Sequence, residues 1–358
     1  MDLKKIRQNL HEIRYFKRLI CRYGESLLPG RYCLFPSMRA IVLDNESSMA
    51  NAKPYFYRDK AESNTSALIA KINKLGYYYN RKSGDTKKYE AIYSANNYDK
   101  VREIKLFSFQ RNEILTICTC SEDCQKQISE YTALHTFFDM PRVIKKTQYD
   151  NSYEISMIRL LPRLSDTNAL QNITQCTTKY NKSHKEDIVA ERVEDIISFD
   201  YRNKEICKML TNLAANVDER MYDMEIPVCL QHGDLSRDNL IYGECDGSQG
   251  FWWIDWEHAR KRIFFYDYFF YILNTAVCFL DNSSFYGYIN GEFDVQLEEY
   301  FTAHGMVYDP LHKKDYFLIF AIDFLKQRVC DFGKVKALAM YFDFINKRLL
   351  SGNCKCLS

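Results

Sequence analysis

The sequence has no apolar run long enough to be a clear membrane span, and it has almost no net charge. Its most apolar stretch, residues 264–280, is short for a bilayer crossing and contains Asp267, so we expect a buried helix there. The first ten residues, MDLKKIRQNL, lack the apolar core of a secretory signal peptide. A formal charge of +2 is too small for general nucleic-acid binding. We therefore expect a cytoplasmic protein without a nucleic-acid partner.

Histidine is scarce, with seven residues, and the chain has no internal repeat or low-complexity tract. The 13 cysteines are odd in number and scattered, which favours reduced thiols over a disulfide framework. Cys118, Cys120 and Cys124 form a C-x-C-x-x-x-C cluster, but no fourth ligand is spaced to complete a zinc site. We interpret them as small core residues. Aromatic residues reach 15% of the chain, and we expect most of them to fill the core.

The first 24 residues have apolar side chains at helical spacing with basic side chains between them. This pattern predicts an amphipathic helix whose basic residues include Lys4, Lys5, Arg7 and Arg14. Two interpretations stay open. The helix either docks on an anionic surface, which would place the protein peripherally at the inner face of the membrane, or packs on its own domain with a solvated basic face.

The chain is predicted to have four parts: an N-terminal extension (1–88), a strand-rich part (89–161), a mainly helical part (162–350) and a tail (351–358). In the extension we expect a strand at 39–43, a helix at 67–75 and a polar connection at 77–88. The next part has expected strands at 89–94, 101–109 and 113–120, a helix at 121–138 with Ser121 as N-cap, and strands at 142–147 and 153–160. In the helical part we expect a strand at 226–230 and helices at 185–198, 203–220, 266–279, 295–303, 316–331 and 334–350.

Residues 231–257 contain the side chains that phosphoryl transfer requires. They read QHGDLSRDN, LIY, a polar turn and then FWWIDWE. The reaction needs a carboxylate to orient and deprotonate the attacking hydroxyl, and oxygen ligands for Mg²⁺. Asp234, on a loop made tight by Gly233, is placed to be the catalytic base. The following hairpin returns Asp255 to this loop, so we expect Asp255 and Asn239 to hold Mg²⁺.

This stretch resembles the signature of the aminoglycoside phosphotransferase and choline kinase superfamily, H-G-D-x-x-x-x-N followed by a hydrophobic-D-[FW]-E element. Residues 232–234 with Asn239 match the first element, and residues 254–257 match the second. The resemblance covers residues 89 to about 345. It implies a two-lobed, protein-kinase-like α+β fold, with an antiparallel-sheet N-lobe and a mainly helical C-lobe. It also implies transfer from ATP, or alternatively GTP, to a small-molecule hydroxyl with Mg²⁺, with Asp234 as base, Asn239 and Asp255 as metal ligands, and Asp267 bracing the loop.

The predicted N-lobe departs from the family where the nucleotide phosphates are normally clamped. The family has a lysine on the third strand, paired with a glutamate on the following helix. Glu130 supplies the glutamate, but Thr116 stands where the lysine is expected. Lys105 on the preceding strand and Lys126 on the helix are the candidate substitutes. The loop at 94–97 also lacks the glycines of protein kinases.

Two other residues of the loop are candidates for supporting the chemistry. Arg237 is placed to neutralise the transferred phosphoryl group, and the alternative is a salt bridge to a neighbouring acid such as Asp238. We expect His232 to brace the loop rather than to catalyse.

Rival functions and the identity of the acceptor stay open. A metal-dependent hydrolase would use His232, Asp234, Asp255, Glu257 and His258, although the other five histidines have no matching ligand spacing. The Thr116 departure motivates a catalytically weak, kinase-like binding protein. The acceptor is predicted to be a sugar, an amino alcohol or a similar metabolite. Residues 39–43 and 55–58, ahead of a helix ending at 74–76, resemble extensions of bacterial phosphotransferases associated with cell-envelope saccharides. Together with the basic first helix, this resemblance favours an envelope-linked sugar over an antibiotic.

Overall fold

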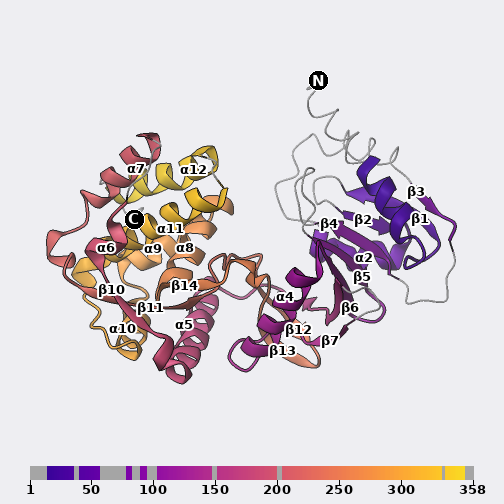
Figure 1. Cartoon of the computed structure of the whole chain (residues 1–358), viewed down its shortest axis with the longest axis horizontal. Coiled ribbons are helices and arrows are strands. Elements are labelled where there is room, and N and C mark those ends of the chain that lie inside the picture. Colours follow the sequence, from indigo (N-terminus) through magenta and orange to yellow (C-terminus); the bar gives the residue numbers. More distant parts are fainter. Residues whose placement is uncertain are drawn as a thin grey trace. The chain divides into compact units, whose positions relative to one another are not determined.

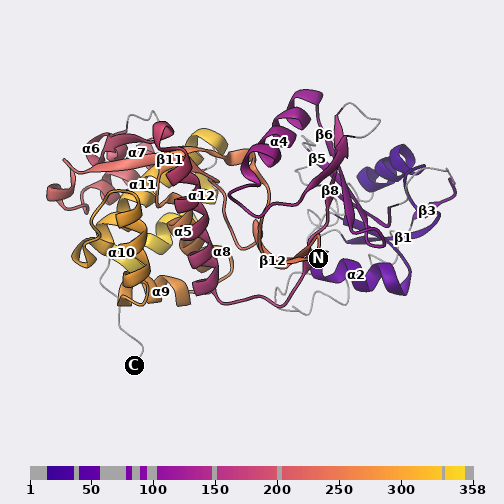
Figure 2. The same cartoon turned by 90° about the horizontal axis from the view of Figure 1, so that it is seen from below.

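The computed structural model describes residues 14–35, 40–56, 78–82, 89–94, 103–146, 151–199, 204–332 and 335–350. The chain forms two compact units. Unit 1 comprises Met1–His135, Met140–Pro162 and Tyr242–Gly250, and unit 2 comprises Thr136–Asp139, Arg163–Ile241 and Phe251–Ser358. Strands dominate unit 1 and helices dominate unit 2 (Figures 1 and 2). The predicted α+β class, with an antiparallel sheet in one unit and mainly helices in the other, is confirmed.

Unit 1 is built on an eight-stranded sheet in the order β3-β1-β2-β4-β5-β6-β8-β7, with antiparallel pairing throughout. The strands are β1 (Gly30–Phe35), β2 (Ala40–Leu43), β3 (Tyr78–Asn80), β4 (Ala91–Ser94), β5 (Glu103–Ser108), β6 (Glu113–Cys118), β7 (Val143–Lys146) and β8 (Ser152–Ser156). Because β2 pairs with β4, the strands of the predicted extension and those of the following part share one sheet.

Helices cover both faces of this sheet. Residues 14–23 are helical and pack on one face, whereas α2 (Glu46–Phe56) packs on the other. Along β2, Ile41 and Leu43 join the cluster under the first helix, and Ala40 and Val42 join the cluster under α2, as strand alternation requires. The described basic residues of the first helix are exposed, namely Arg14, Lys17, Arg18 and Arg22. This arrangement matches packing on its own domain; Lys4, Lys5 and Arg7 lie outside the described residues.

Helix α4 (Ser121–Leu134) follows β6 and differs from prediction at both ends. Its N-cap is Cys120, whose sulfur accepts a hydrogen bond from Asp123 N, so Ser121 is already helical. It ends before residue 138 because Phe137 and Phe138 leave the helix and pack against Tyr180 and Trp253 respectively. Two of the clustered cysteines, Cys118 and Cys124, are buried with Tyr153 and Ile155, in agreement with a core role.

Unit 1 also departs from the sequence predictions at one strand and at one helix. The strand expected at 153–160 is interrupted, since β8 ends at Ser156 and a short strand, β9 (Arg159–Leu160), pairs with β12 (Leu240–Cys245) instead. Helix α2 was not predicted. The helix expected at 67–75 lies outside the described residues.

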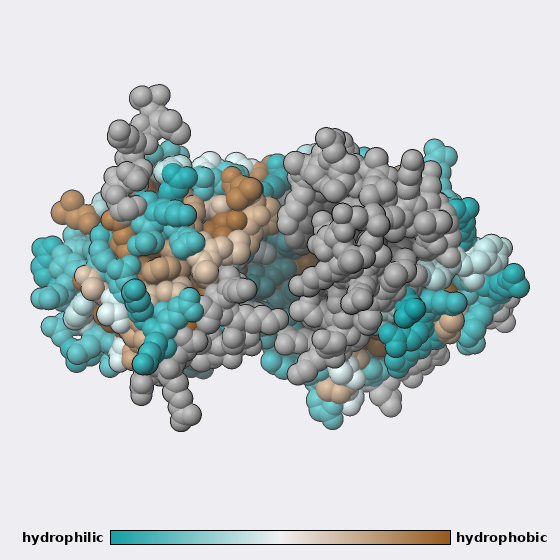
Figure 3. Space-filling model, turned by 90° about the horizontal axis from the view of Figure 1, so that it is seen from above, coloured by the Kyte–Doolittle hydropathy of each residue, from teal (hydrophilic) through white to brown (hydrophobic). Residues whose placement is uncertain are grey.

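Unit 2 surrounds the central helix α8 (Tyr266–Cys278), in which every residue from Tyr266 to Val277 is buried. The predicted buried helix at 264–280 is therefore confirmed. Its neighbours are α5 (Asp166–Ser183), α9 (Ser283–Asn290), α11 (Lys313–Phe332) and α12 (Val335–Ile345). Within the described ranges, none of the helices combines the length and the apolar composition that a bilayer crossing requires. The face of unit 2 drawn in Figure 3 carries hydrophobic residues among hydrophilic ones.

Unit 2 also contains α6 (Val193–Ile197), α7 (Lys204–Ala214), α10 (Asp294–Ala303) and the sheet β10-β11-β14, formed by Val189–Arg192, Glu225–Gln231 and Arg260–Ile263. The helix expected at 185–198 is wrong over its first half. Residues 189–192 pair with β11, and this tertiary pairing overrides local helical preference. Helix α5 was missed because its buried face includes Thr174, Thr177 and Asn181, which weaken the apolar period.

Candidate active site

Strand β11, held between β10 and β14, leads directly into the loop that carries Asp234. Gly233 turns this loop with φ +81°, and a Cβ at this position would lie 2.4 Å from the carbonyl oxygen of His258. Only glycine fits there without displacing backbone. The Ser236 carbonyl then accepts hydrogen bonds from the backbone N–H groups of Asn239 (3.0 Å) and Leu240 (2.9 Å). These bonds close the loop and bring Asn239 back to Asp234.

Asp267, in the first turn of α8, is buried beneath the loop and accepts two of its backbone N–H groups. His232 N donates to Oδ2 at 2.6 Å, and Gly233 N donates to Oδ1 at 2.9 Å. Asp267 N in turn donates to the Gln231 side-chain oxygen at 3.2 Å. Burial raises the pKa of Asp267 to about 6, while the two backbone hydrogen bonds act in the opposite direction. These contacts are compatible with the bracing role that the family resemblance implies for Asp267.

His232 links this loop to the strand end that precedes Asp255. Its Nε2–H donates to the carbonyl oxygen of Ile254 at 2.8 Å, and its Nδ1 accepts from Asp234 N at 3.3 Å. Both contacts are satisfied by a neutral imidazole. Burial lowers the pKa of His232 to about 4, which also favours the neutral form. Both ring nitrogens are engaged, so the imidazole connects the loop to Ile254.

Asn239 and Asp255 reach the loop from the hairpin formed by β12 and β13 (Ser248–Trp253), whose turn contains Asp246 and Gly247, both with positive φ. Asn239 Nδ2 donates to the Asp234 carbonyl oxygen at 2.8 Å and lies 3.4 Å from Asp234 Oδ2. Its amide nitrogen is therefore turned into the loop, and Oδ1 is left to accept. Asn239 O also accepts from Ile254 N at 3.0 Å.

Asp255 comes directly after Ile254, both of whose backbone groups are bonded, one to Asn239 and one to His232. The Asp255 side chain is exposed, and its backbone is in the left-handed region with φ 66°. Non-glycine residues in this region are uncommon outside functional sites and turns. Hydrogen bonds thus tie the loop that carries Asp234 and Asn239 to Ile254, the residue next to Asp255.

Sequence reasoning missed Arg328, on α11. Its guanidinium forms an ion pair with Asp234 Oδ1, and Nη2 also lies 3.4 Å from the carbonyl oxygen of Gly233. The rings of Phe270 and Phe324 lie 5.3 and 5.7 Å from the guanidinium carbon, so aromatic faces hold the charge in place. Its only signal in the sequence was an arginine within an apolar helical pattern.

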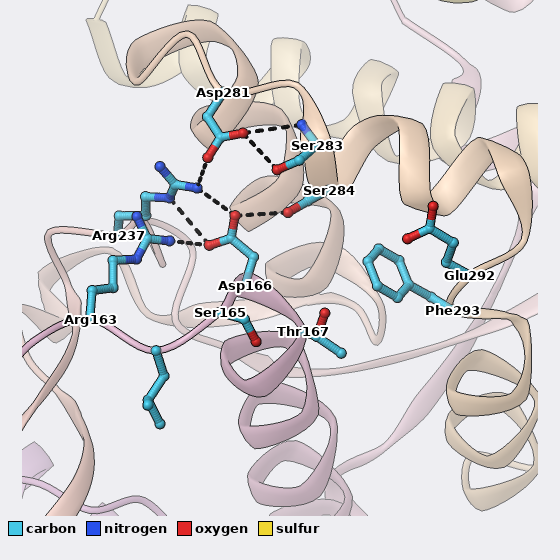
Figure 4. A pocket seen from close by; sticks show the side chains of 11 residues that line it. Arg163, Ser165, Asp166, Thr167, Arg237, Asp281, Ser283, Ser284, Glu292 and Phe293 are labelled. Atoms are coloured by element: carbon cyan, nitrogen blue, oxygen red, sulfur yellow. Dashed lines mark hydrogen bonds and ion pairs between the residues drawn. The ribbon is translucent and has the colours of Figure 1, made fainter. Parts of the chain in front are cut away.

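Arg237 is held by two acids from other parts of unit 2. Its guanidinium forms ion pairs with Asp166, at the start of α5, and with Asp281, in the segment after α8 (Figure 4). The neighbouring Asp238 suggested by sequence is not its partner. Burial acts against the ionised form, but hydrogen bonds from Ser283 and Arg237 lower the pKa of Asp281 to about 2. Arg237 is therefore locked in a network of charges.

The proposed nucleotide residues lie in unit 1, on β5 and α4. Lys105 stands directly opposite Thr116 in the β5–β6 register, so the two side chains share one face of the sheet. Lys105 Nζ lies 2.7 Å from Glu103 Oε1. Glu130 Oε1 lies 3.7 Å from Lys126 Nζ, one helical turn away. Each acid therefore has a lysine partner, from strand β5 in one case and from helix α4 in the other.

The metal site of a hydrolase is not formed by the part of the chain that the structure describes. There, no group of three or more His, Cys, Asp and Glu side chains is arranged to hold a metal ion. His258 Nε2 lies 3.3 Å from Glu257 Oε1, and His232 is engaged on both sides. A Mg²⁺ site of kinase type is different, because it combines few protein oxygens with phosphate oxygens and water.

No protein-family model and no curated protein matches the sequence. The structure is similar to those of small-molecule phosphotransferases and kinases. Macrolide 2'-phosphotransferase type I is 14% identical, over 80% of this chain and 98% of that chain, with a TM-score of 0.40. Choline kinase LicA from Streptococcus pneumoniae is 13% identical over 80% and 99%, with a TM-score of 0.43. Aminoglycoside phosphotransferase APH(4)-Ia is 14% identical over 73% and 93%, with a TM-score of 0.44.

Proposed function

We propose that this chain is a phosphotransferase of the aminoglycoside phosphotransferase and choline kinase superfamily, and that it transfers the γ-phosphoryl group of ATP to a hydroxyl of a small molecule. The observation that carries the proposal is the frame around Asp234. Hydrogen bonds of His232, Ile254 and the Asp267 carboxylate tie the loop that carries Asp234 and Asn239 to the end of the hairpin beside Asp255. Such positioning is most of what phosphoryl transfer asks of a protein.

Asp234 is the residue that would orient and deprotonate the acceptor. Because Arg328 pairs with Oδ1, the acceptor hydroxyl is best received at Oδ2. The hydroxyl oxygen forms a bond to the γ-phosphorus as the bond from that phosphorus to the β–γ bridging oxygen breaks. ADP leaves with the electron pair of the broken bond, and the hydroxyl proton passes to Asp234. This step needs no covalent intermediate on the protein.

The donor set fits a hard divalent cation such as Mg²⁺. Asp255 offers an exposed carboxylate, and Asn239 offers the amide oxygen that remains after Nδ2 has bonded to the loop. When bound there, Mg²⁺ would shield the negative charge of the donor phosphates. Because Nδ2 of Asn239 is bonded to the loop, Oδ1 is the atom that would face the cation.

Lys105 is our candidate for the missing phosphate-clamping lysine. It projects from the strand next to β6, at the position opposite Thr116, and Glu103 lies within ion-pair distance. Glu130, paired with Lys126, is the second candidate acid on this side of the sheet. Lys105 therefore supplies the expected charge from the neighbouring strand, with ATP as the proposed donor and GTP as the alternative.

A sugar is the proposed class of acceptor, and an envelope-linked saccharide is its narrower form. The narrower form is favoured by the resemblance of residues 39–43 and 55–58 to extensions of envelope-associated phosphotransferases, together with the basic residues of 1–24. Reversing the charges of Lys4, Lys5, Arg7 and Arg14 is expected to release the protein from the membrane fraction. Unchanged fractionation would remove the main support for an envelope-linked acceptor and favour a free sugar.

The test of the function is a transfer assay with γ-labelled ATP or GTP, a panel of sugars and amino alcohols, and Mg²⁺ or excess chelator. We expect label in at least one alcohol, only with nucleotide and Mg²⁺. Release of phosphate from phosphoesters without nucleotide would instead support the hydrolase. Nucleotide binding without any transfer would support the catalytically weak binding protein.

A further inference from the structure

A pocket of about 400 Å³ lies in unit 2, and Arg237 of the Asp234 loop forms part of its wall (Figure 4). The rest of its lining comes from the segment that leads into α5, the first turn of α5, the segment between α8 and α9, the start of α9, and the segment between α9 and α10. Because Arg237 is three positions from Asp234 in one tight loop, the pocket is built on the same loop as the proposed base.

One wall of the pocket is a ladder of alternating charges, Arg163, Asp166, Arg237 and Asp281. Asp166 accepts hydrogen bonds from both arginines, from Tyr271 Oη (2.9 Å) and from Ser284 Oγ (2.9 Å). Five donor atoms on two carboxylate oxygens leave it no capacity for a ligand. Asp166 is therefore the scaffold of the wall, and the arginines it orients are the groups available to a ligand.

The arginines retain hydrogen-bond donors. Among the described residues, Arg237 Nη1 and the Nε and Nη1 atoms of Arg163 have no hydrogen-bond partner, and the Arg163 side chain is 42% exposed. Acceptors come from elsewhere in the lining. The Asp281 side chain is 39% exposed, and the exposed carboxylate of Glu292 lies across the pocket from the arginines in Figure 4. Donors and acceptors thus face one space.

The backbone beside Asp281 gives independent support for a functional wall. Leu280 has φ 56° and is 84% exposed, a strained conformation for a bulky apolar residue. Such strain persists only where surrounding contacts enforce it, and it clusters at functional sites. Here the contacts are those of Asp281 with Arg237 and with Ser283 N (3.1 Å) and Oγ (2.6 Å).

We propose that this pocket is the acceptor subsite and that it selects a polyhydroxylated ring, a sugar or a cyclitol, through Arg163 and Glu292. A hydroxyl both donates and accepts, so it satisfies both sides of the pocket. A carboxylate or phosphate only accepts, and an ammonium only donates, so each would leave one side unmatched. This inference rests on the proposed function, since it names the acceptor of that reaction.

The test measures steady-state kinetics with ATP and a panel of D-glucose, D-mannose, myo-inositol, choline and ethanolamine. The variants are Arg163→Met and Glu292→Gln, with Arg220→Met and Glu298→Gln as controls at exposed positions of the same unit. In Arg163→Met, Asp166 keeps its contacts with Arg237, Tyr271 and Ser284, so its negative charge is still balanced and its oxygens are still hydrogen-bonded. We expect KM for the preferred polyol to rise roughly 10- to 100-fold in the pocket variants, because each variant loses one charged hydrogen bond to the polyol. The values of kcat and of KM for ATP should change little. The controls should match the wild type.

The inference is overturned if choline or ethanolamine is the preferred acceptor, or if Arg163→Met behaves like Arg220→Met. Saturation-transfer NMR with the polyols, recorded without nucleotide, separates this failure from that of the proposed function. Polyol binding that is lost in Arg163→Met, with no transfer from ATP to any alcohol, would leave the pocket as a polyol site and refute the phosphotransferase. ATP-dependent transfer to an alcohol without polyol binding would support the phosphotransferase and refute the polyol pocket.

Discussion

The guanidinium of Arg328 is ion-paired with the carboxylate of Asp234, although 94 residues separate them in the chain. The two side chains are 9% and 31% exposed, so the pair is shielded on the arginine side and open on the aspartate side. This asymmetry holds Oδ1 against Arg328, and Oδ2, which lies 3.4 Å from Asn239 Nδ2, is the oxygen that we propose for the acceptor hydroxyl. Arg328 is thus a positioning residue for the proposed base.

Replacing Arg328 by methionine is expected to lower kcat roughly 10- to 100-fold, because Asp234 loses the group that orients it. Methionine keeps apolar contact with Phe270 and Phe324, and KM for ATP should change little. Arg328→Lys should recover part of the loss, since it restores the charge but not the planar fork. An Arg328→Met enzyme with wild-type kcat would show that the ion pair has no part in catalysis.

Gly233→Ala should unfold more easily than the wild type and lose most activity. The new methyl group would meet His258 O at 2.4 Å, and φ is +81°. Gly305→Ala is the matched control, because φ is +77° there and nothing lies within 4 Å of the added Cβ. The control should lose only about 1–2 kcal/mol of unfolding free energy, the cost of left-handed backbone. If denaturant titrations show the same loss of unfolding free energy in both variants, contact between the added methyl group and His258 O is not what destabilises Gly233→Ala.

His232 should make the protein less stable as pH falls from about 6.5 towards 4. Its folded pKa, about 4, lies below the ordinary unfolded value of about 6.5. Between these values the unfolded chain binds a proton that the folded chain does not, so the unfolding free energy falls on acidification. By pH 4 the titration of His232 lowers the unfolding free energy by up to about 3 kcal/mol.

In His232→Gln this titration is absent, and the stability difference between wild type and variant should narrow by a similar amount between pH 7 and pH 4. Denaturant titrations at several pH values measure the difference in unfolding free energy between wild type and His232→Gln. If this difference does not change with pH, His232 is not held neutral in the folded protein. Asp267, whose folded pKa is raised to about 6, contributes with the opposite sign in both proteins.

Lys105 and Lys126 can be distinguished as nucleotide-binding lysines by matched substitutions. Lys105→Met is expected to raise KM for ATP about tenfold or more, because a charge-assisted contact to phosphate is lost. Lys126→Met should have little effect, since the Lys126 side chain is 65% exposed and pairs with Glu130 within the same helix. The reverse ranking in initial-rate kinetics would assign the role to Lys126.

The part of the site that sequence reasoning could anticipate is local. Asp234, Asn239 and Asp255 lie within one loop and one hairpin, so their spacing and the turn already bring them close. Asp267 follows at the start of the next helix. The structure adds the bonds that sequence spacing does not specify, such as those between Ile254 and both His232 and Asn239.

The parts that could not be predicted depend on tertiary packing. Arg328 and Asp166 reach the loop from α11 and α5, and no local pattern links them to it. Helix α5 itself was hidden by polar residues on its buried face, and β10 takes its conformation from β11 rather than from its own residues. The sheet of unit 1 was anticipated from β4 to β8, where apolar alternation is strong, but its continuation through β1 and β3 was not.

The central claim is that Asp234 is the base of an ATP-dependent phosphotransferase. The most direct measurement is transfer of label from γ-labelled ATP, with Mg²⁺, to the best acceptor of the panel. The wild type is compared with an Asp234→Asn variant that is shown to unfold at the same temperature as the wild type. We predict transfer by the wild type and a loss of roughly 10²- to 10⁴-fold in kcat for the variant, the usual contribution of a positioned base. Near-normal transfer by a folded Asp234→Asn protein would contradict the account.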